Sequence, residues 1–142
     1  MDVRVWGAVQ NRLIEVSTVP GDEFAVLGLP QGRSRTAMDR IRAALVNSRV
    51  LPEVPALAVH VQPALRAGRT QNLDLPIALS ALAALTPMPV GWLFATGRLG
   101  LDGTIHASGL PGRVTLPEVI DAICHGSSHL LSFEHMFEGE GV

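Results

Sequence analysis

The residue types that could ligate a metal gather near the C-terminus of the chain. Five candidate ligands occur there: Cys124, His125, His129, Glu134 and His135. His125 and His129 are four residues apart, a spacing that suits zinc when both lie on one face of a helix. The residues between them include Gly126, Ser127 and Ser128, which favour a turn over a helix. We therefore expect no metal site, and we interpret the cluster as part of a loop and tail.

The chain has no lysine, because all 11 of its basic residues are arginine. A guanidinium group stays protonated at physiological pH and is a poor general base. A lysine base, a Schiff base and a P-loop lysine are therefore excluded within this sequence. The segment Gly97–Gly100 is too short and wrongly spaced for a dinucleotide-binding loop. We expect no catalytic residue, no cofactor and no small-molecule substrate.

One carboxylate, Asp74, stands directly before the apolar segment Leu75–Leu85. Aspartate is a favoured N-cap, and Pro76 suits the first helical turn. The sequence predicts a helix that is apolar on nearly every face, and hence buried, with Asp74 as its cap. A catalytic carboxylate at Asp74 is the alternative, and the capping role is the one that we expect.

Seven arginines in one helix and one loop could form a basic face. They are Arg33, Arg35, Arg40, Arg42, Arg49, Arg66 and Arg69. The plainer interpretation is a solvated helix face plus a loop. The alternative is contact with nucleic-acid phosphate or with an acidic neighbouring subunit. No aromatic residues are interleaved with these arginines, which argues against stacking on a single strand.

The clearest helix is predicted over Ser34–Ser48, with Ser34 as its N-cap. Its inward stripe has helical spacing and consists of Ala37, Ile41, Ala44, Leu45 and Ser48, with Met38 beside it. A final helix is predicted over Leu116–Cys124.

Alternating and short apolar runs predict seven strands. They cover Val3–Val9, Leu13–Val19, Phe24–Leu29, Leu57–Val61, Gly91–Thr96, Gly103–His106 and Leu130–Phe133. Turns are expected at Gln10–Arg12 and at Asp102–Gly103, and residues 136–142 are expected to be a frayed tail. This order of elements predicts one α+β domain over residues 1–142, with helices packed on a mixed sheet.

Composition agrees with a folded domain that has its own core. The 142 residues are 47% hydrophobic and 17% charged, and the net charge of -2 gives no global basic field. The N-terminus lacks the layout of a signal peptide, and the longest apolar run is too short to span a bilayer. A single cysteine suits a reducing compartment. We expect no membrane association.

Four blocks resemble the N-terminal region of the Mg-chelatase-like AAA+ family, which includes the competence-type ComM and YifB proteins. They are Leu27–Pro30 followed by the helix ending Arg42–Ser48, then Asp74–Leu79, then Leu99–Gly103, and then Gly109–Gly112. The blocks occur in the order and at about the spacing of that family. One departure concerns charge, since relatives commonly have Gly-Glu-Leu where this chain has Gly97, Arg98 and Leu99.

The resemblance implies a fold of the ribosomal protein S5 domain 2 type, shared with the Lon protease domain, in the bacterial cytoplasm. Lon-type proteases use a serine at the start of the helix corresponding to Leu75–Leu85 and a lysine from a later helix. Asp74 holds the serine place, and the lysine place falls near Gly112–Thr115. With no lysine the dyad cannot form, so the resemblance implies a pseudo-protease. No Gly-x-x-x-x-Gly-Lys motif of an AAA+ ATPase module occurs in the 142 residues.

Three hypotheses about function follow. The first is a non-catalytic accessory or assembly domain that contacts other copies or an AAA+ partner and helps to position DNA. The second is a nucleic-acid-binding module that uses the arginine-rich helix over residues 34–49. The third is a cryptic hydrolase centred on Asp74 or on the terminal histidines.

Overall fold

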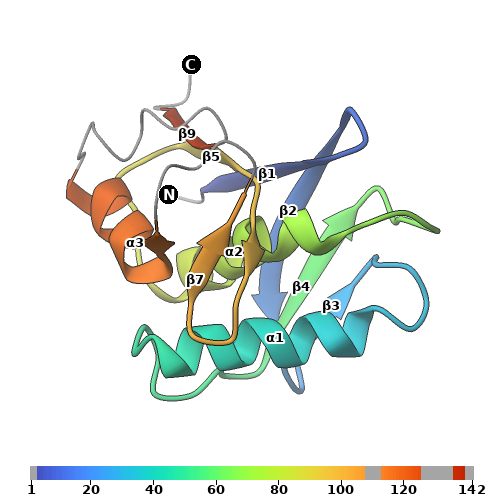
Figure 1. Ribbon diagram of the computed structural model, residues 1–142, viewed down its shortest axis with the longest axis horizontal. Coiled ribbons are helices and arrows are strands. Elements are labelled where there is room, and N and C mark those ends of the chain that lie inside the picture. The colour runs from blue at the N-terminus through green and yellow to red at the C-terminus, as the bar shows by residue number, and fades with distance from the viewer. Residues whose placement is uncertain (1–2, 108–112, 126–135, 140–142) are drawn as a thin grey trace.

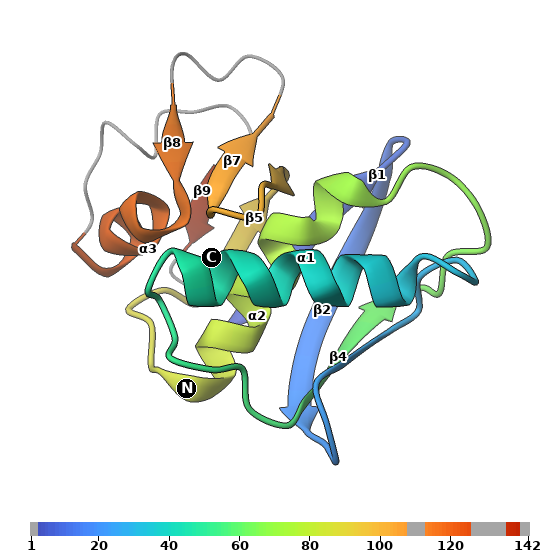
Figure 2. The ribbon, with the colours of Figure 1, turned by 60° about the horizontal axis from the view of Figure 1, so that its bottom comes forward.

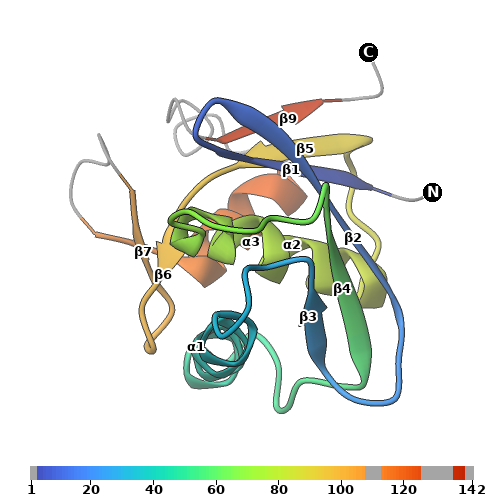
Figure 3. The same ribbon diagram turned by 90° about the vertical axis from the view of Figure 1, so that its right-hand side faces the viewer.

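The computed structural model describes residues 3–107, 113–125 and 136–139. Within them, a strongly curved sheet wraps around helix α2 (Asp74–Leu85), with helix α1 (Ser34–Asn47) on the same side (Figure 1 and Figure 3). The strands of this sheet are β1 (Arg4–Val9), β2 (Arg12–Pro20), β3 (Ala25–Leu27), β4 (Leu57–Gln62), β5 (Trp92–Ala95) and β9 (Met136–Gly139). The predicted α+β class with a mixed sheet is confirmed.

The six strands lie in the order β3-β4-β2-β1-β5-β9. Neighbours β3 and β4 are parallel, as are β1 and β5, whereas the other pairs are antiparallel. The parallel pair β3 and β4 needs a long crossover, which α1 supplies. The hairpin between β1 and β2 closes through Gln10 and Asn11, both with positive φ, as a two-residue turn of this kind requires. The predicted turn is therefore confirmed.

Helix α1 presents its predicted stripe to the core, since Ala37, Ile41, Ala44 and Leu45 are buried. The prediction for Ser34 is wrong. Ser34 is the first helical residue, and its hydroxyl donates to the carbonyl oxygen of Val26 at 2.5 Å instead of capping the helix. The adjacent strand β3 offers that acceptor, and local sequence gives no sign of it.

Helix α2 is buried from Asp74 to Leu82, as the run of apolar residues predicts. It follows a short 3₁₀ turn, η1 (Gln71–Leu73), so Leu73 takes the capping position. The predicted capping role of Asp74 is therefore wrong, because its side chain makes no cap bond and turns toward other elements. The hydroxyl of Ser80 on the same helix bonds Thr18 Oγ1 at 2.8 Å, which satisfies a polar group inside an apolar interface.

A second sheet consists of β6 (Arg98–Leu99), β7 (Thr104–His106) and β8 (Val114–Thr115), and α3 (Leu116–His125) follows it. Figure 2 shows β7, β8 and α3 grouped at one end, with α1 crossing in front of α2. The turn at Asp102–Gly103 and the helix α3 were predicted, whereas β6 and β8 are too short to show a pattern. No helix within the described residues is long and apolar enough to cross a membrane.

The C-terminal segment contains a strand that the sequence did not predict. The expected frayed tail over residues 136–142 is wrong for Met136–Gly139, which pair with β5 as strand β9. Pairing with the edge of the sheet stabilises a segment whose own sequence does not demand a strand. The predicted strand Leu130–Phe133 lies outside the described residues.

Candidate anion-binding surface

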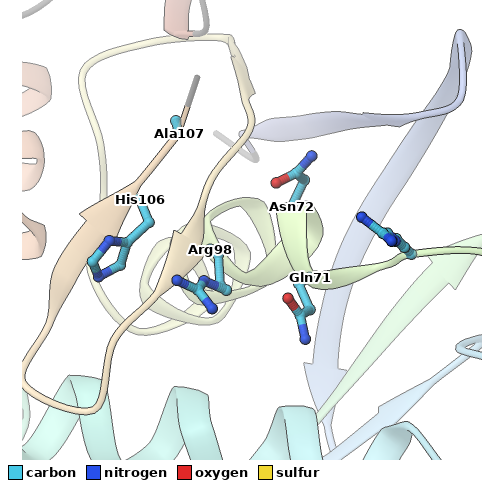
Figure 4. A pocket seen from close by; sticks show the side chains of 6 residues that line it. Gln71, Asn72, Arg98, His106 and Ala107 are labelled. Atoms are coloured by element: carbon cyan, nitrogen blue, oxygen red, sulfur yellow. The ribbon is translucent and has the colours of Figure 1, made fainter. Parts of the chain in front are cut away.

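A shallow, polar hollow of about 450 Å³ lies where η1 meets the second sheet. It is lined by Arg69, Gln71, Asn72, Arg98, His106 and Ala107. In Figure 4, Arg98 and His106 extend from the adjacent strands β6 and β7, and the amides of Gln71 and Asn72 extend from η1. Arg98 and His106 are direct partners in the antiparallel register, which brings the two side chains to one edge of the hollow.

Asp74 begins α2 directly after η1 and is only 1% exposed. Arg40 of α1 donates to both of its oxygens, with Nε to Oδ2 at 2.7 Å and Nη2 to Oδ1 at 2.8 Å. The backbone N–H of Leu99 donates to Oδ2 at 3.0 Å. The carboxylate therefore joins α1, α2 and β6 and offers no free edge to a substrate.

The electrostatics of this pair follow from its burial. Burial raises the pKa of Asp74, and the donors of Arg40 and Leu99 oppose that rise. The hydrogen bond to Asp74 raises the pKa of Arg40. Because both carboxylate oxygens accept from N–H groups, these contacts stabilise the ionised carboxylate.

The seven arginines that could form a basic face do not all line one hollow. Arg33 and Arg40 lie on one side of α1, and Arg35 and Arg42 lie on another. Arg33 and Arg40 line a smaller hollow, which shares Gln71 with the larger one. Arg69 lines the larger hollow.

The other predicted arginines have separate environments. Arg42 lies over the Phe24 ring at 5.5 Å from its centroid and 3.9 Å from a carboxylate oxygen of Asp39. Arg49 has a positive φ of 64° and lines a different hollow beside α3. Arg35 and Arg66 are exposed and line neither of the polar hollows beside η1.

Arg98 and His106 belong to this surface although neither was predicted as a contact residue. His106 is exposed at the end of β7. The departure from Gly-Glu-Leu at Arg98 was the one available signal. His106 also lines a neighbouring hollow of about 360 Å³ together with Asp102, Thr104, Ile105 and Arg113.

The metal-ligand cluster gains no support within the described residues, where no group of three histidine, cysteine, aspartate or glutamate side chains could hold a metal ion. His125 ends α3, and its Nδ1 lies 2.9 Å from Asp121 Oδ1. Cys124 is exposed. His129, Glu134 and His135 lie outside the described residues. His60 is half-buried on β4.

The chemistry that the larger hollow offers is hydrogen-bond donation and positive charge. Its lining residues carry two guanidinium groups, two amides and an imidazole, and none carries a carboxylate. Such a surface suits an anion better than a neutral substrate.

The family model described as Subunit ChlI of Mg-chelatase matches residues 14–134. The chain belongs to the ChlI family. It is 29% identical to YifB of Salmonella typhimurium over 123 residues, which cover 84% of this chain and 23% of that protein. It is 28% identical to YifB of Escherichia coli K12 over 131 residues, covering 87% and 25%.

The competence protein ComM of Haemophilus influenzae is 33% identical over 94 residues, which cover 59% of this chain and 18% of that relative. The chain thus spans a quarter or less of the length of these curated relatives.

Three of the blocks that carry the ChlI-family resemblance meet at one junction. Asp74 of the second block accepts from Leu99 N of the third. Gly103 has φ 89°, and a Cβ there would lie 2.6 Å from Cβ of Ser48 at the end of the α1 block. Contact this close admits only glycine without a shift of the backbone. These residues of the ChlI domain therefore hold α1, α2 and the second sheet together.

Proposed function

We propose that this ChlI-family domain is non-catalytic and serves as an accessory or assembly domain of an AAA+ protein. The observation that carries the proposal is the enclosure of Asp74 by Arg40 and Leu99. A carboxylate that acts as nucleophile or base needs an edge within hydrogen-bond reach of a substrate, and this one has none.

The Lon-type comparison supports the same proposal. Asp74 holds the place of the serine, and the chain has no lysine to activate a nucleophile. Arg113, in the stretch that corresponds to the lysine, donates to Asp102 at 2.8 Å and to the Thr104 hydroxyl at 3.2 Å. The side chains at both of the places that correspond to the dyad, Asp74 and Arg113, are therefore hydrogen-bonded to neighbours in the fold.

A turnover screen tests the absence of catalysis. Peptide, ester and phosphate substrates would be incubated with the chain and with Asp74→Asn, each with and without added zinc. We expect no turnover above background in either protein. Turnover by the parent chain that Asp74→Asn abolishes would establish the cryptic hydrolase instead. The assembly role is tested by sedimentation of the chain alone and with an AAA+ partner, and a monomer that binds neither copy nor partner would contradict it.

Nucleic-acid binding is the second candidate, favoured by Arg69 and Arg98 on the rim of a hollow without carboxylates. Phosphate contacts release counterions, so an affinity built on them must fall as salt rises. This candidate uses the hollow at η1 and not the whole arginine-rich helix 34–49, whose cations point in different directions.

Sedimentation with a duplex DNA fragment at low and moderate salt tests this candidate. We expect Arg69→Gln and Arg98→Gln each to lower the salt slope by about 1. The matched control is Arg42→Gln, because Arg42 is already held over Phe24. Binding that ignores salt, or that Arg42→Gln weakens equally, would exclude phosphate contacts at the hollow.

A further inference from the structure

A second, smaller hollow lies between the first two turns of α1 and the residues that lead into η1. Its volume is about 140 Å³. Its lining residues are Gly32, Arg33, Thr36, Ala37, Arg40, Thr70 and Gln71. At roughly 30 Å³ per water molecule, this space holds a few waters or one small polyatomic ion.

The start of α1 has no side-chain cap. Arg33 takes the capping position without a side-chain capping hydrogen bond, and the Ser34 hydroxyl donates to the carbonyl oxygen of Val26. The first backbone N–H groups of a helix lack partners within the helix and carry its positive dipole end. A helix N-terminus whose backbone N–H groups have no side-chain cap favours the binding of an anion.

Thr70 supplies an independent indication of a ligand. The residue is only 5% exposed and lines the hollow. Among the described residues its hydroxyl has no hydrogen-bond partner. A buried hydroxyl without a partner is destabilising, and native structures usually satisfy such groups. A ligand in the hollow would provide the missing partner.

The charges around the hollow have the matching sign. Arg33 is exposed and makes no ion pair within the described part of the chain. Arg40 uses two of its five N–H groups on Asp74 and also lines the hollow. None of the lining residues is acidic.

We propose that this hollow binds a phosphate-type oxyanion. The ligand would accept from the first-turn N–H groups of α1, from Arg33 and Gln71, and from the Thr70 hydroxyl. The proposal goes beyond the accessory role, because it holds whether or not the domain assembles or binds DNA. Free phosphate and a phosphodiester group share this chemistry, and the experiment separates them.

The test is a titration of the full chain with inorganic phosphate at constant ionic strength, followed by amide resonances in NMR spectra. We expect saturable shifts of the Ser34, Arg35, Thr36 and Gln71 amides. Arg33→Gln and Thr70→Val should each weaken binding roughly tenfold. Arg35→Gln, in the same turn but outside the hollow, is the matched control and should change affinity less than about twofold.

Two results would overturn the proposal. One is the absence of saturable shifts at these amides, and the other is equal weakening by Arg35→Gln. Thr70→Val gives a separate check in phosphate-free buffer. Its unfolding midpoint should match or exceed that of the parent chain, since the variant removes an unsatisfied hydroxyl. A clear loss of stability would mean that the hydroxyl has a partner within the fold, which also overturns the proposal.

Addition of a duplex DNA fragment identifies the source of the oxyanion. Shifts of the same amides that Thr70→Val weakens would support a phosphodiester group. Phosphate binding that the duplex leaves unchanged would support a free phosphate. Neither result bears on turnover, so failure of this site and failure of the non-catalytic proposal remain distinguishable.

Discussion

Arg40–Asp74 and Arg113–Asp102 are two arginine–aspartate pairs, one beside strand β6 and one at the turn that follows it. Their shortest nitrogen–oxygen distances are 2.7 and 2.8 Å. The side chains of Arg40 and Asp74 are 17% and 1% exposed, whereas those of Arg113 and Asp102 are 72% and 57% exposed. Asp74 also accepts from a backbone N–H of β6.

Burial, and not length, separates these pairs. An exposed pair gains little because water screens it and its side chains lose freedom. A buried pair contributes little net stability against an apolar replacement, but removal of one partner leaves an uncompensated charge. The root of the β6–β7 hairpin should therefore be sensitive to substitution, and the charges at its tip should not be.

The largest expected effect comes from Asp74→Ala. The variant leaves the Arg40 charge and the Leu99 N–H without their acceptor, which should destabilise the fold by about 3–5 kcal/mol. Urea unfolding followed by tryptophan fluorescence measures the change. The double variant Arg40→Met with Asp74→Leu should recover part of it. A loss as small as that of Asp102→Ala would remove the distinction between the two pairs.

Gly103→Ala tests whether packing, and not charge, holds the tip of the hairpin. The left-handed backbone alone costs about 1–2 kcal/mol for alanine, and the Ser48 contact should add to this. Gly32→Ala is the matched control, since Gly32 has φ 86° and nothing within 4 Å of its Cβ position. Equal effects in the two variants, measured by thermal unfolding, would show that the Ser48 contact contributes nothing.

Arg40→Lys keeps the buried charge and removes the two-pronged geometry. One oxygen of Asp74 then loses its donor, with an expected cost of about 1–3 kcal/mol. The same change at Arg113 should be nearly silent because that side chain is exposed. Denaturant midpoints of both lysine variants give the comparison, and a larger loss at Arg113 would reverse it.

The smallest effect concerns pH. The Thr104 N–H, followed by smaller contributions that include Arg113, lowers the pKa of Asp102. A lowered folded-state pKa means that the stabilisation is present above the ordinary aspartate pKa and is lost as pH falls through the folded value. Asp102→Asn should therefore flatten the acid limb of the stability curve slightly. An unchanged acid limb would show that the contact does not persist in solution.

Local pattern predicted the parts of the fold whose residues act through their own segment. The stripe of α1 and the uniformly apolar α2 follow from spacing and composition. The hairpin of β1 and β2 follows from alternation around a two-residue turn. The prediction of a frayed tail was wrong for Met136–Gly139, because these residues pair with β5, a strand that is distant in sequence.

The candidate site was less predictable because its members come from separate segments. Arg98 and His106 become neighbours only through the register of β6 and β7. Six of the seven arginines are exposed, but helical rotation directs Arg33 and Arg42 to different sides of α1. Thr70 carries no signal in the sequence, since its significance lies in having no hydrogen-bond partner for its hydroxyl among the described residues.

The sequence by itself determined the family, the α+β class, the core faces and the lack of any lysine chemistry, because these depend on residue identity and local periodicity. The tertiary structure alone decided that Asp74 is enclosed and not a cap. Its partners Arg40 and Leu99 lie 34 and 25 residues away. Hydrogen bonds over such separations depend on how helices and strands pack, and no local pattern encodes that packing.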